Sequence, residues 1–211
     1  ILFRHVERNH LGFTRKEYVP GRIHRCLPHP SSDLFEMLPF QARVRIESCY
    51  EKTLRRINRG HTFRDAVEAL EATARRGLNQ GAHFIFGLPG ETREEMLNEA
   101  EIISELPVKT VKFHQLQIIK GTAMEEEYRK NPHDFADFSL EEYLGFMVEF
   151  LERLNPEIIV ERFTGEAPPR YLSRAPWGKK RTDQLVSLVE KKLEELDTWQ
   201  GRCYKKGAGH K

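Results

Sequence analysis

The chain has 211 residues, of which 39% are hydrophobic and 31% are charged, and its formal net charge is +2. This composition is typical of a globular protein with one core, and the near balance of charge does not demand strong non-specific binding of nucleic acid. Because no apolar run approaches the roughly 18 residues that span a bilayer, and no signal peptide is recognisable, we expect a cytoplasmic protein without a membrane segment.

Cysteine spacing argues against a metal site made by this chain. The three cysteines are Cys26, Cys49 and Cys203, each in a different part of the sequence. Because a metal-binding loop or a clip needs cysteines close together, no metal ligands are predicted, and free thiols in a reducing compartment are expected.

The amino-terminal stretch differs from the rest of the chain. It carries several prolines and four of the nine histidines, with little sustained periodicity. We therefore expect an irregular remnant over residues 1–43, whose sequence could be damaged or out of frame. The first residue is Ile rather than Met, so we expect the gene product to begin upstream.

The next stretch reads as helix, strand and helix. Thr62 can cap a helix that ends near Gly77. A short apolar strand follows over residues 83–86, and a glycine-rich turn at 87–90 stops it. Thr92, with a glutamate three residues later, forms a capping box that predicts the start of another helix.

The same order repeats toward the carboxyl terminus. β-Branched residues predict a strand over 108–119, followed by a helix over 123–130. Ser139 opens a further helix through a second capping box, and residues 158–160 form a further strand. Apolar residues at helical spacing predict a last helix over about 182–196.

This alternation predicts the fold class. Strands that alternate with helices of about ten to fifteen residues indicate a parallel α/β sheet with right-handed crossovers. Only about four strands are present, whereas a complete eight-stranded barrel takes about 250 residues. We therefore expect an incomplete, half TIM-type parallel barrel over residues 44–165 and a helical extension over 166–211. Missing strands would leave an uncovered sheet edge, which also indicates truncation.

Three stretches place polar residues or glycines just after a predicted strand: 46–61, 81–92 and 111–122. In α/β barrels the carboxyl ends of the strands form the active-site face. Glycines there let the backbone approach a ligand, and the following helix offers free N–H groups to anions. The sequence therefore predicts a binding site at this end of the sheet.

These stretches contain the motifs INRGH, GLPGE and KFHQLQIIKGT, in this order. Together they resemble an uncharacterised bacterial family of radical S-adenosylmethionine (SAM) proteins related to the catalytic subunit of elongator, over about residues 46–202. The resemblance implies a partial TIM barrel in which a 4Fe-4S cluster reduces SAM to a 5′-deoxyadenosyl radical. Three thiolates from one loop bind such a cluster. No such cysteine spacing exists here, so the resemblance implies cluster ligands upstream, in another part of the same gene product.

The resemblance also implies which residues meet the cofactor. Glu47 and Ser48 match the position that faces the ribose or methionine part of SAM. Gly87, Pro89 and Gly90 match the strand end that lines the adenine. These five are the expected cofactor-binding residues.

Five other residues are expected on the substrate side. The resemblance implies His114 and Lys120, whereas Arg59 and His61 are expected at the mouth of the site and Arg162 as a cation for an anionic substrate. The substrate is not named by the sequence, and RNA is suggested by analogy with elongator alone.

Each assignment has a structural alternative. Glu47 can pair with Arg55 or Arg56, and the GLPGE stretch can be a tight turn before a helix. His83, within an apolar run, reads more as a packed histidine than as a ligand, and His114 can equally be a satisfied structural histidine.

Three functions follow from the sequence. The first is a fragment of a radical SAM enzyme, inactive alone because the cluster cysteines are absent. The second is a non-catalytic module that binds RNA or a protein partner through a basic and aromatic tail. The third is a truncated product without a stable function. Residues 43–45 depart from the acidic, aromatic and glycine run that the family has there, which weakens the expected SAM contact and indicates a damaged amino-terminal region.

Overall fold

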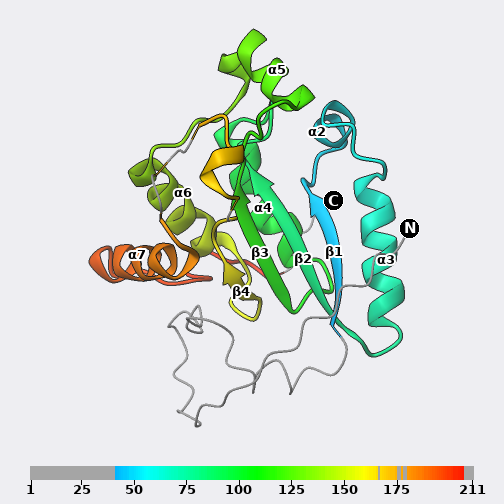
Figure 1. Ribbon diagram of the computed structural model, residues 1–211. Helices are drawn as coiled ribbons and strands as arrows, with labels where there is room; N and C mark the ends of the chain where they lie inside the picture. Colours follow the sequence, from blue (N-terminus) through cyan, green and yellow to red (C-terminus); the bar gives the residue numbers. More distant parts are fainter. Residues whose placement is uncertain (1–40, 166, 175–176, 178–179, 207–211) are drawn as a thin grey trace.

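Four parallel strands form the sheet of the computed structural model, which describes residues 41–206 except 166, 175–176 and 178–179. Most of the predicted remnant, residues 1–43, and Cys26 therefore lie outside the described residues. The strands are β1 (Gln41–Glu47), β2 (Asn79–Phe86), β3 (Thr110–Gln115) and β4 (Ile159–Arg162), and they lie in the order β1-β2-β3-β4 (Figure 1). Each strand pairs in parallel with the next. This is half of an eight-stranded α/β barrel, so the predicted fold class is confirmed.

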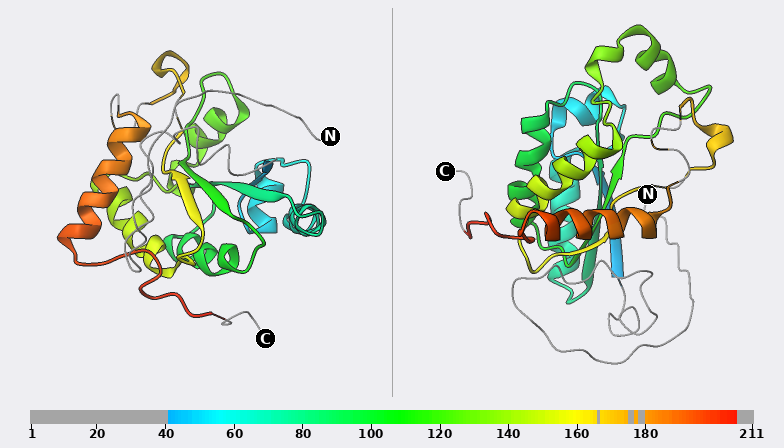
Figure 2. Two further views of the ribbon diagram at one scale, coloured as in Figure 1. Left: turned by 90° about the horizontal axis from the view of Figure 1, so that it is seen from below. Right: turned by 90° about the vertical axis from the view of Figure 1, so that its left-hand side faces the viewer.

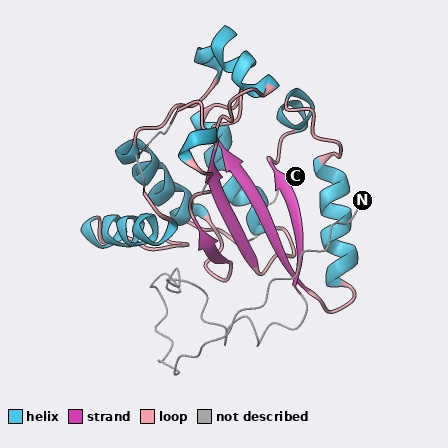
Figure 3. Cartoon of the chain, viewed as in Figure 1, coloured by secondary structure: helices cyan, strands magenta, loops and turns pink. Residues whose placement is uncertain are grey.

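Helices connect the strands and surround one side of the sheet (Figure 3). They are α2 (Glu51–Arg56), α3 (Phe63–Ala74), α4 (Arg93–Ser104), α5 (Ala123–Lys130), α6 (Leu140–Arg153) and α7 (Thr182–Glu195), with short 3-10 turns η1 (Pro132–Asp134) and η2 (Pro169–Tyr171). The two further views place α3, α4 and α6 on the same side of the sheet (Figure 2). Among the described residues, no helix is long and apolar enough to cross a membrane.

The helix starts follow from local sequence. The side chains of Thr62, Thr92 and Ser139 each accept a hydrogen bond from the backbone N–H three residues later, and the carboxylate at that position accepts one from the backbone N–H of the cap residue. These capping boxes satisfy N–H groups that the helix itself leaves unpaired. The predicted starts of α3, α4 and α6 are therefore confirmed.

Strand β3 is shorter than the predicted strand over 108–119. Its last parallel partner is Phe86, which pairs with Gln115, and β2 ends there. Beyond that point Ile119 forms an antiparallel bridge with Leu172 instead. The β-branched pattern continues past the sheet because these residues pair with a different segment.

The core lies between the sheet and its helices. Phe86 and Phe113 of the sheet meet Phe146 and Phe150 of α6, with ring centroids between Phe150 and the two sheet rings 4.9 and 5.0 Å apart. All four rings are fully buried. Successive side chains of a strand point to opposite faces. The residues next to Phe86 and Phe113 in β2 and β3 therefore face away from the helices.

That other face is charged. We call it the polar face and define it by Arg43, Arg45, Glu47, His83, Lys112, His114 and Glu161. Arg43 of β1 reaches Glu161 of β4 at 3.0 Å, and Lys112 of β3 reaches the same carboxylate at 3.2 Å. In a flat sheet β1 and β4 would lie about 14 Å apart. The contact therefore forms because the sheet curves toward the polar face, as the wall of a barrel does.

Candidate functional site

Glu47, at the carboxyl end of β1, is aimed onto the polar face by an irregular backbone. The pairing of β1 with β2 slips by one residue between Arg45 and Glu47, and Glu47 has a left-handed φ of 75°. A non-glycine residue in this region costs roughly 1 kcal/mol or more, and such strain clusters at functional sites. The Glu47 carboxylate lies 2.9 Å from His83 Nδ1 and 3.5 Å from Arg59 Nη2.

Two buried carboxyl groups hold the segment that follows Glu47. The Ser48 hydroxyl donates to Glu91 Oε1 at 2.5 Å, and the Cys49 N–H donates to Glu99 Oε1 at 2.6 Å. Burial raises the pKa of Glu91, and burial together with the charge of Glu91 raises the pKa of Glu99. The Ser48 hydroxyl is thus already hydrogen-bonded to Glu91. Together the two hydrogen bonds hold the backbone that follows the strained residue Glu47.

Two histidines lie side by side on the polar face. The rings of His83 and His114 meet edge to face, with centroids 4.2 Å apart. Burial, reinforced by the neighbouring His83 and by the positive charge of Arg162, lowers the pKa of the His114 imidazole to about 2. His114 is therefore neutral near pH 7, with one N–H to donate and one lone pair to accept. Gly165 closes over this ring, because an added Cβ would lie 2.6 Å from His114 Nδ1.

Buried polar atoms without a hydrogen-bond partner gather on or beside this face. They include Arg59 Nε, His83 Nε2, His114 Nε2 and Glu161 Oε1. Glu47 Oε2 and His83 Nδ1 lie 2.9 Å apart and also have no aligned hydrogen-bond partner. Since about 90% or more of buried polar groups in proteins are paired, such a concentration indicates a place for water or a polar ligand.

The turn after β2 is tightly packed. Gly87 and Gly90 have left-handed φ angles of 87° and 83°. An added Cβ would lie 2.9 Å from Ala136 O at Gly87 and 2.8 Å from Arg56 Nη1 at Gly90, while Pro89 between them is buried. Both glycines are thus required by the turn itself, and contact of this turn with adenine stays a prediction.

The expected substrate-side residues divide into two groups. Arg59 touches the Glu47 carboxylate, and Arg162 is near enough to His114 for its charge to lower the pKa of that ring. The structure therefore brings Glu47, Arg59, His114 and Arg162 together around His83.

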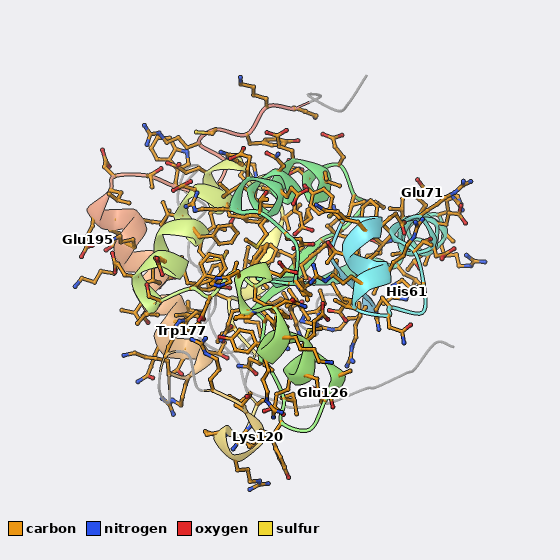
Figure 4. All side chains as sticks on the ribbon, turned by 90° about the horizontal axis from the view of Figure 1, so that it is seen from above. His61, Glu71, Lys120, Glu126, Trp177 and Glu195 are labelled. Atoms are coloured by element: carbon orange, nitrogen blue, oxygen red, sulfur yellow. The ribbon has the colours of Figure 1, made fainter. Side chains whose placement is uncertain are left out.

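His61 and Lys120 do not join this group. Viewed onto the carboxyl ends of the strands, the two lie far apart, His61 near α3 and Lys120 beside η2 (Figure 4). Both stay predictions as substrate contacts, on the rim rather than on the polar face.

His83 is the residue that sequence reasoning undervalued. The sequence predicts a short apolar strand over residues 83–86, but only Phe84 and Phe86 point to the helices. The alternation of the strand was the available signal, because it puts His83 on the face opposite the two phenylalanines.

The described residues do not fit an iron–sulfur cluster. Among them no group of three or more His, Cys, Asp or Glu side chains is placed to hold a metal. Burial, with the charges of Glu99 and Glu91, raises the pKa of the Cys49 thiol, which opposes the thiolate that a cluster needs. Cys203 is exposed and follows α7, far along the chain from Cys49.

Comparison with protein families places this geometry in a known context. The model of the radical SAM superfamily matches residues 32–103, and that of the Radical_SAM C-terminal domain matches residues 108–195. The chain belongs to the radical SAM superfamily. The polar face is thus the concave side of a parallel sheet in a protein of this superfamily.

The chain is also similar to individual proteins. The chain is 33% identical to the uncharacterised protein MJ0486 of Methanocaldococcus jannaschii over 157 residues, 74% of this chain and 48% of that protein. It is 30% identical to YtqA of Bacillus subtilis over 185 residues, 86% of this chain and 56% of YtqA. The chain therefore spans about half the length of these curated relatives.

Two more distant proteins are also similar to this chain. The archaeal Methanocaldococcus infernus Elp3 with an amino-terminal deletion superposes with a TM-score of 0.64 at 20% identity, covering 79% of this chain and 38% of that chain, and shows the fold alone. A tRNA-2-methylthio-N(6)-dimethylallyladenosine synthase of Erythrobacter litoralis is 26% identical over 151 residues, 67% of this chain and 33% of that enzyme.

Proposed function

We propose that residues 44–165 are the carboxyl-terminal half barrel of a radical SAM enzyme, with residues 166–211 as its extension, and that the polar face holds polar groups of SAM and of the substrate. One observation carries this proposal: the buried, unpartnered polar atoms of His83 and His114, with the strained Glu47 beside them, gather on the inner wall of the barrel. Unsatisfied donors and acceptors in a protein of this superfamily fit a cofactor that carries ribose hydroxyls, an ammonium group and a carboxylate.

The charges of the face suit the two ends of such a ligand. The Glu47 carboxylate can accept hydrogen bonds from the ribose hydroxyls or the ammonium group, since carboxylates are strong acceptors. Lys112 and Arg162 carry positive charge toward the other end of the face, near His114. The neutral His114 ring can donate or accept a hydrogen bond there without introducing a charge.

For the strand-end turns we propose more limited roles. Ser48 acts through the backbone position of Glu47, because its hydroxyl is engaged by Glu91. The turn at Gly87–Gly90 would meet the adenine through its backbone. A SAM molecule held by Glu47, His83 and His114 would supply radical chemistry once a cluster outside these residues delivers an electron to it.

The cluster itself, we propose, is bound by residues outside these 211. Two facts support this: the wide spacing of the three cysteines, and the match to only about half of each relative. The chain alone is then catalytically inactive. Purified chain treated with iron and sulfide should show no 4Fe-4S absorbance and should not cleave SAM under reducing conditions; both appearing together would overturn this part.

RNA is the substrate class we propose, since one relative of this chain is named as a tRNA-modifying synthase. The two free cysteines among the described residues suit a reducing compartment such as the cytoplasm. A non-catalytic module that binds RNA or a protein partner is the competing function. It predicts no interaction of the polar face with SAM.

Histidine side-chain NMR with added SAM tests the proposed site. The ring signals of His83 and His114 should shift on titration, because both rings lie on the polar face. His133 is an exposed histidine of η1 and is the internal control that should not move. Absence of any shift at His83 and His114, or an equal shift at His133, would contradict the proposal.

A further inference from the structure

A second, outward-facing feature lies at the carboxyl ends of the strands, where two segments far apart in sequence pair. Ile119 bridges Leu172 in antiparallel fashion, and the Lys120 N–H donates to Tyr171 O at 2.8 Å. The Ser173 hydroxyl donates to Glu125 Oε1 of α5 at 2.8 Å, which ties the pair to a helix. These bonds make η2 a fixed part of the rim beside Lys120 (Figure 4).

This rim presents an aromatic ring together with two positive charges. Tyr171 is 50% exposed, an unusual degree for a large ring in this protein. The Arg170 guanidinium lies 4.7 Å from the centroid of that ring, and its Nη2 donates to the Tyr171 hydroxyl at 3.2 Å. The Lys120 ammonium group lies 3.4 Å from Arg170 O.

Both charges are available to a ligand. Within the part of the chain that the structure describes, neither Lys120 nor Arg170 has a carboxylate partner, whereas Arg174 nearby bonds to Asp137 and to the Tyr128 hydroxyl. The surrounding sequence is strongly basic, with six Lys or Arg residues and one acidic residue in positions 162–181 of a chain whose net charge is only +2. The excess positive charge complements a polyanion.

The other aromatic residue of this extension has a different role. Trp177 donates from its indole N–H to Phe138 O at 3.0 Å, and its ring packs 4.7 Å from that of Tyr143. Trp177 therefore anchors the extension to α6, and the ring that is offered to solvent at this rim is Tyr171.

We propose that Tyr171, Arg170 and Lys120 form a docking platform for single-stranded RNA, in which a base stacks on the Tyr171 ring while Arg170 and Lys120 contact the flanking phosphates. Aromatic rings stack on any base, and cations beside them follow the backbone, which is how proteins bind single strands. The platform lies at the carboxyl ends of the strands, where Glu47 and His114 of the polar face also lie, so the RNA strand is held beside the site. This proposal rests on the proposed action on RNA and specifies where that RNA binds.

The test is fluorescence anisotropy of a labelled, unstructured RNA of about twelve nucleotides with the full 211-residue chain at low salt. Tyr171→Ala should weaken binding about tenfold or more, while Tyr171→Phe, which keeps the ring, should stay within about twofold. Lys120→Gln should lower the slope of log K against log salt by about 0.7, as expected for one lost phosphate contact on a single strand.

Trp199→Ala is the matched control. Trp199 is 40% exposed and has Arg202 at 6.0 Å from its ring, the same kind of aromatic and cation pairing. It lies at the opposite end of the sheet, because the neighbouring Gln200 bonds to Ile158 O just before β4. Trp199→Ala should therefore bind RNA as the unmodified chain does.

Three results would overturn the platform: no RNA binding by the unmodified chain, unchanged binding by Tyr171→Ala, or an equal loss in Trp199→Ala. Variants are compared only after thermal unfolding shows the same midpoint, and Tyr171→Phe guards against a folding defect. The histidine NMR titration with SAM is independent of this assay. If RNA binding fails this test while SAM still shifts the signals of His83 and His114, only the platform is refuted. If RNA binding passes the test while SAM shifts neither histidine signal, only the SAM site is refuted.

Discussion

Replacing Glu99 by Gln should change how the stability of this protein depends on pH. Glu99 is fully buried in α4, and its Oε1 accepts the Cys49 N–H. Burial and the charge of Glu91 raise its pKa well above the ordinary 4.5, so the folded protein holds a proton that the unfolded chain releases. A glutamine keeps the accepting oxygen and the shape but has no proton to lose.

The magnitude follows from linkage. Because the folded-state pKa is the higher one, the stabilisation is complete below pH 4.5 and is lost as pH rises toward the folded-state value. In that window each pH unit removes up to about 1.4 kcal/mol of unfolding free energy. The Glu99→Gln variant should lack this slope, so its stability relative to the unmodified chain should rise by up to about 3 kcal/mol between pH 5 and 7.

Urea unfolding at half-unit steps from pH 5 to 7 measures this difference. Glu101→Gln, at an exposed position of the same helix, is the control and should follow the unmodified chain. If the Glu99→Gln curve runs parallel to that of the unmodified chain across the window, Glu99 takes up no proton on folding and the reasoning is wrong.

Two other substitutions test the packing of the polar face and of the core. Gly165→Ala puts a methyl group 2.6 Å from His114 Nδ1, so the His114 ring must move. The SAM-induced NMR shift of His114 should therefore shrink while that of His83 persists. An unchanged His114 shift would contradict this. Phe150→Ala removes the ring that contacts Phe86 and Phe113 at 4.9 and 5.0 Å and should cost about 3–5 kcal/mol in urea unfolding; a loss below about 1 kcal/mol would contradict the described core.

Local signals in the sequence were enough for the architecture. The capping boxes at Thr92 and Ser139 involve residues only three positions apart, so they fix helix starts without knowledge of the fold. The alternation of strands and helices likewise predicted four parallel strands, since crossovers of that length allow few other arrangements.

The candidate site was harder to predict because its contacts join distant residues. Ser48 and Glu91 are 43 positions apart, and in the sequence Glu91 is only an acidic residue near a helix start. The contact of Glu47 with His83 depends on the one-residue slip between β1 and β2, which no periodicity reveals. The exposure of Tyr171 could not be predicted from the sequence, because it results from the pairing of its segment with residues 118–120.

The affinity of the chain for SAM, with and without the Glu47 charge, tests the central claim most directly. Equilibrium dialysis with radiolabelled SAM should show binding to the unmodified chain that Glu47→Gln weakens about tenfold or more, because a hydrogen bond to a charged group contributes about 1.5–3 kcal/mol. Glu101→Gln should bind as the unmodified chain does. Equal affinity of Glu47→Gln and the unmodified chain, or no measurable binding by either, would contradict the assignment of the polar face as the SAM site.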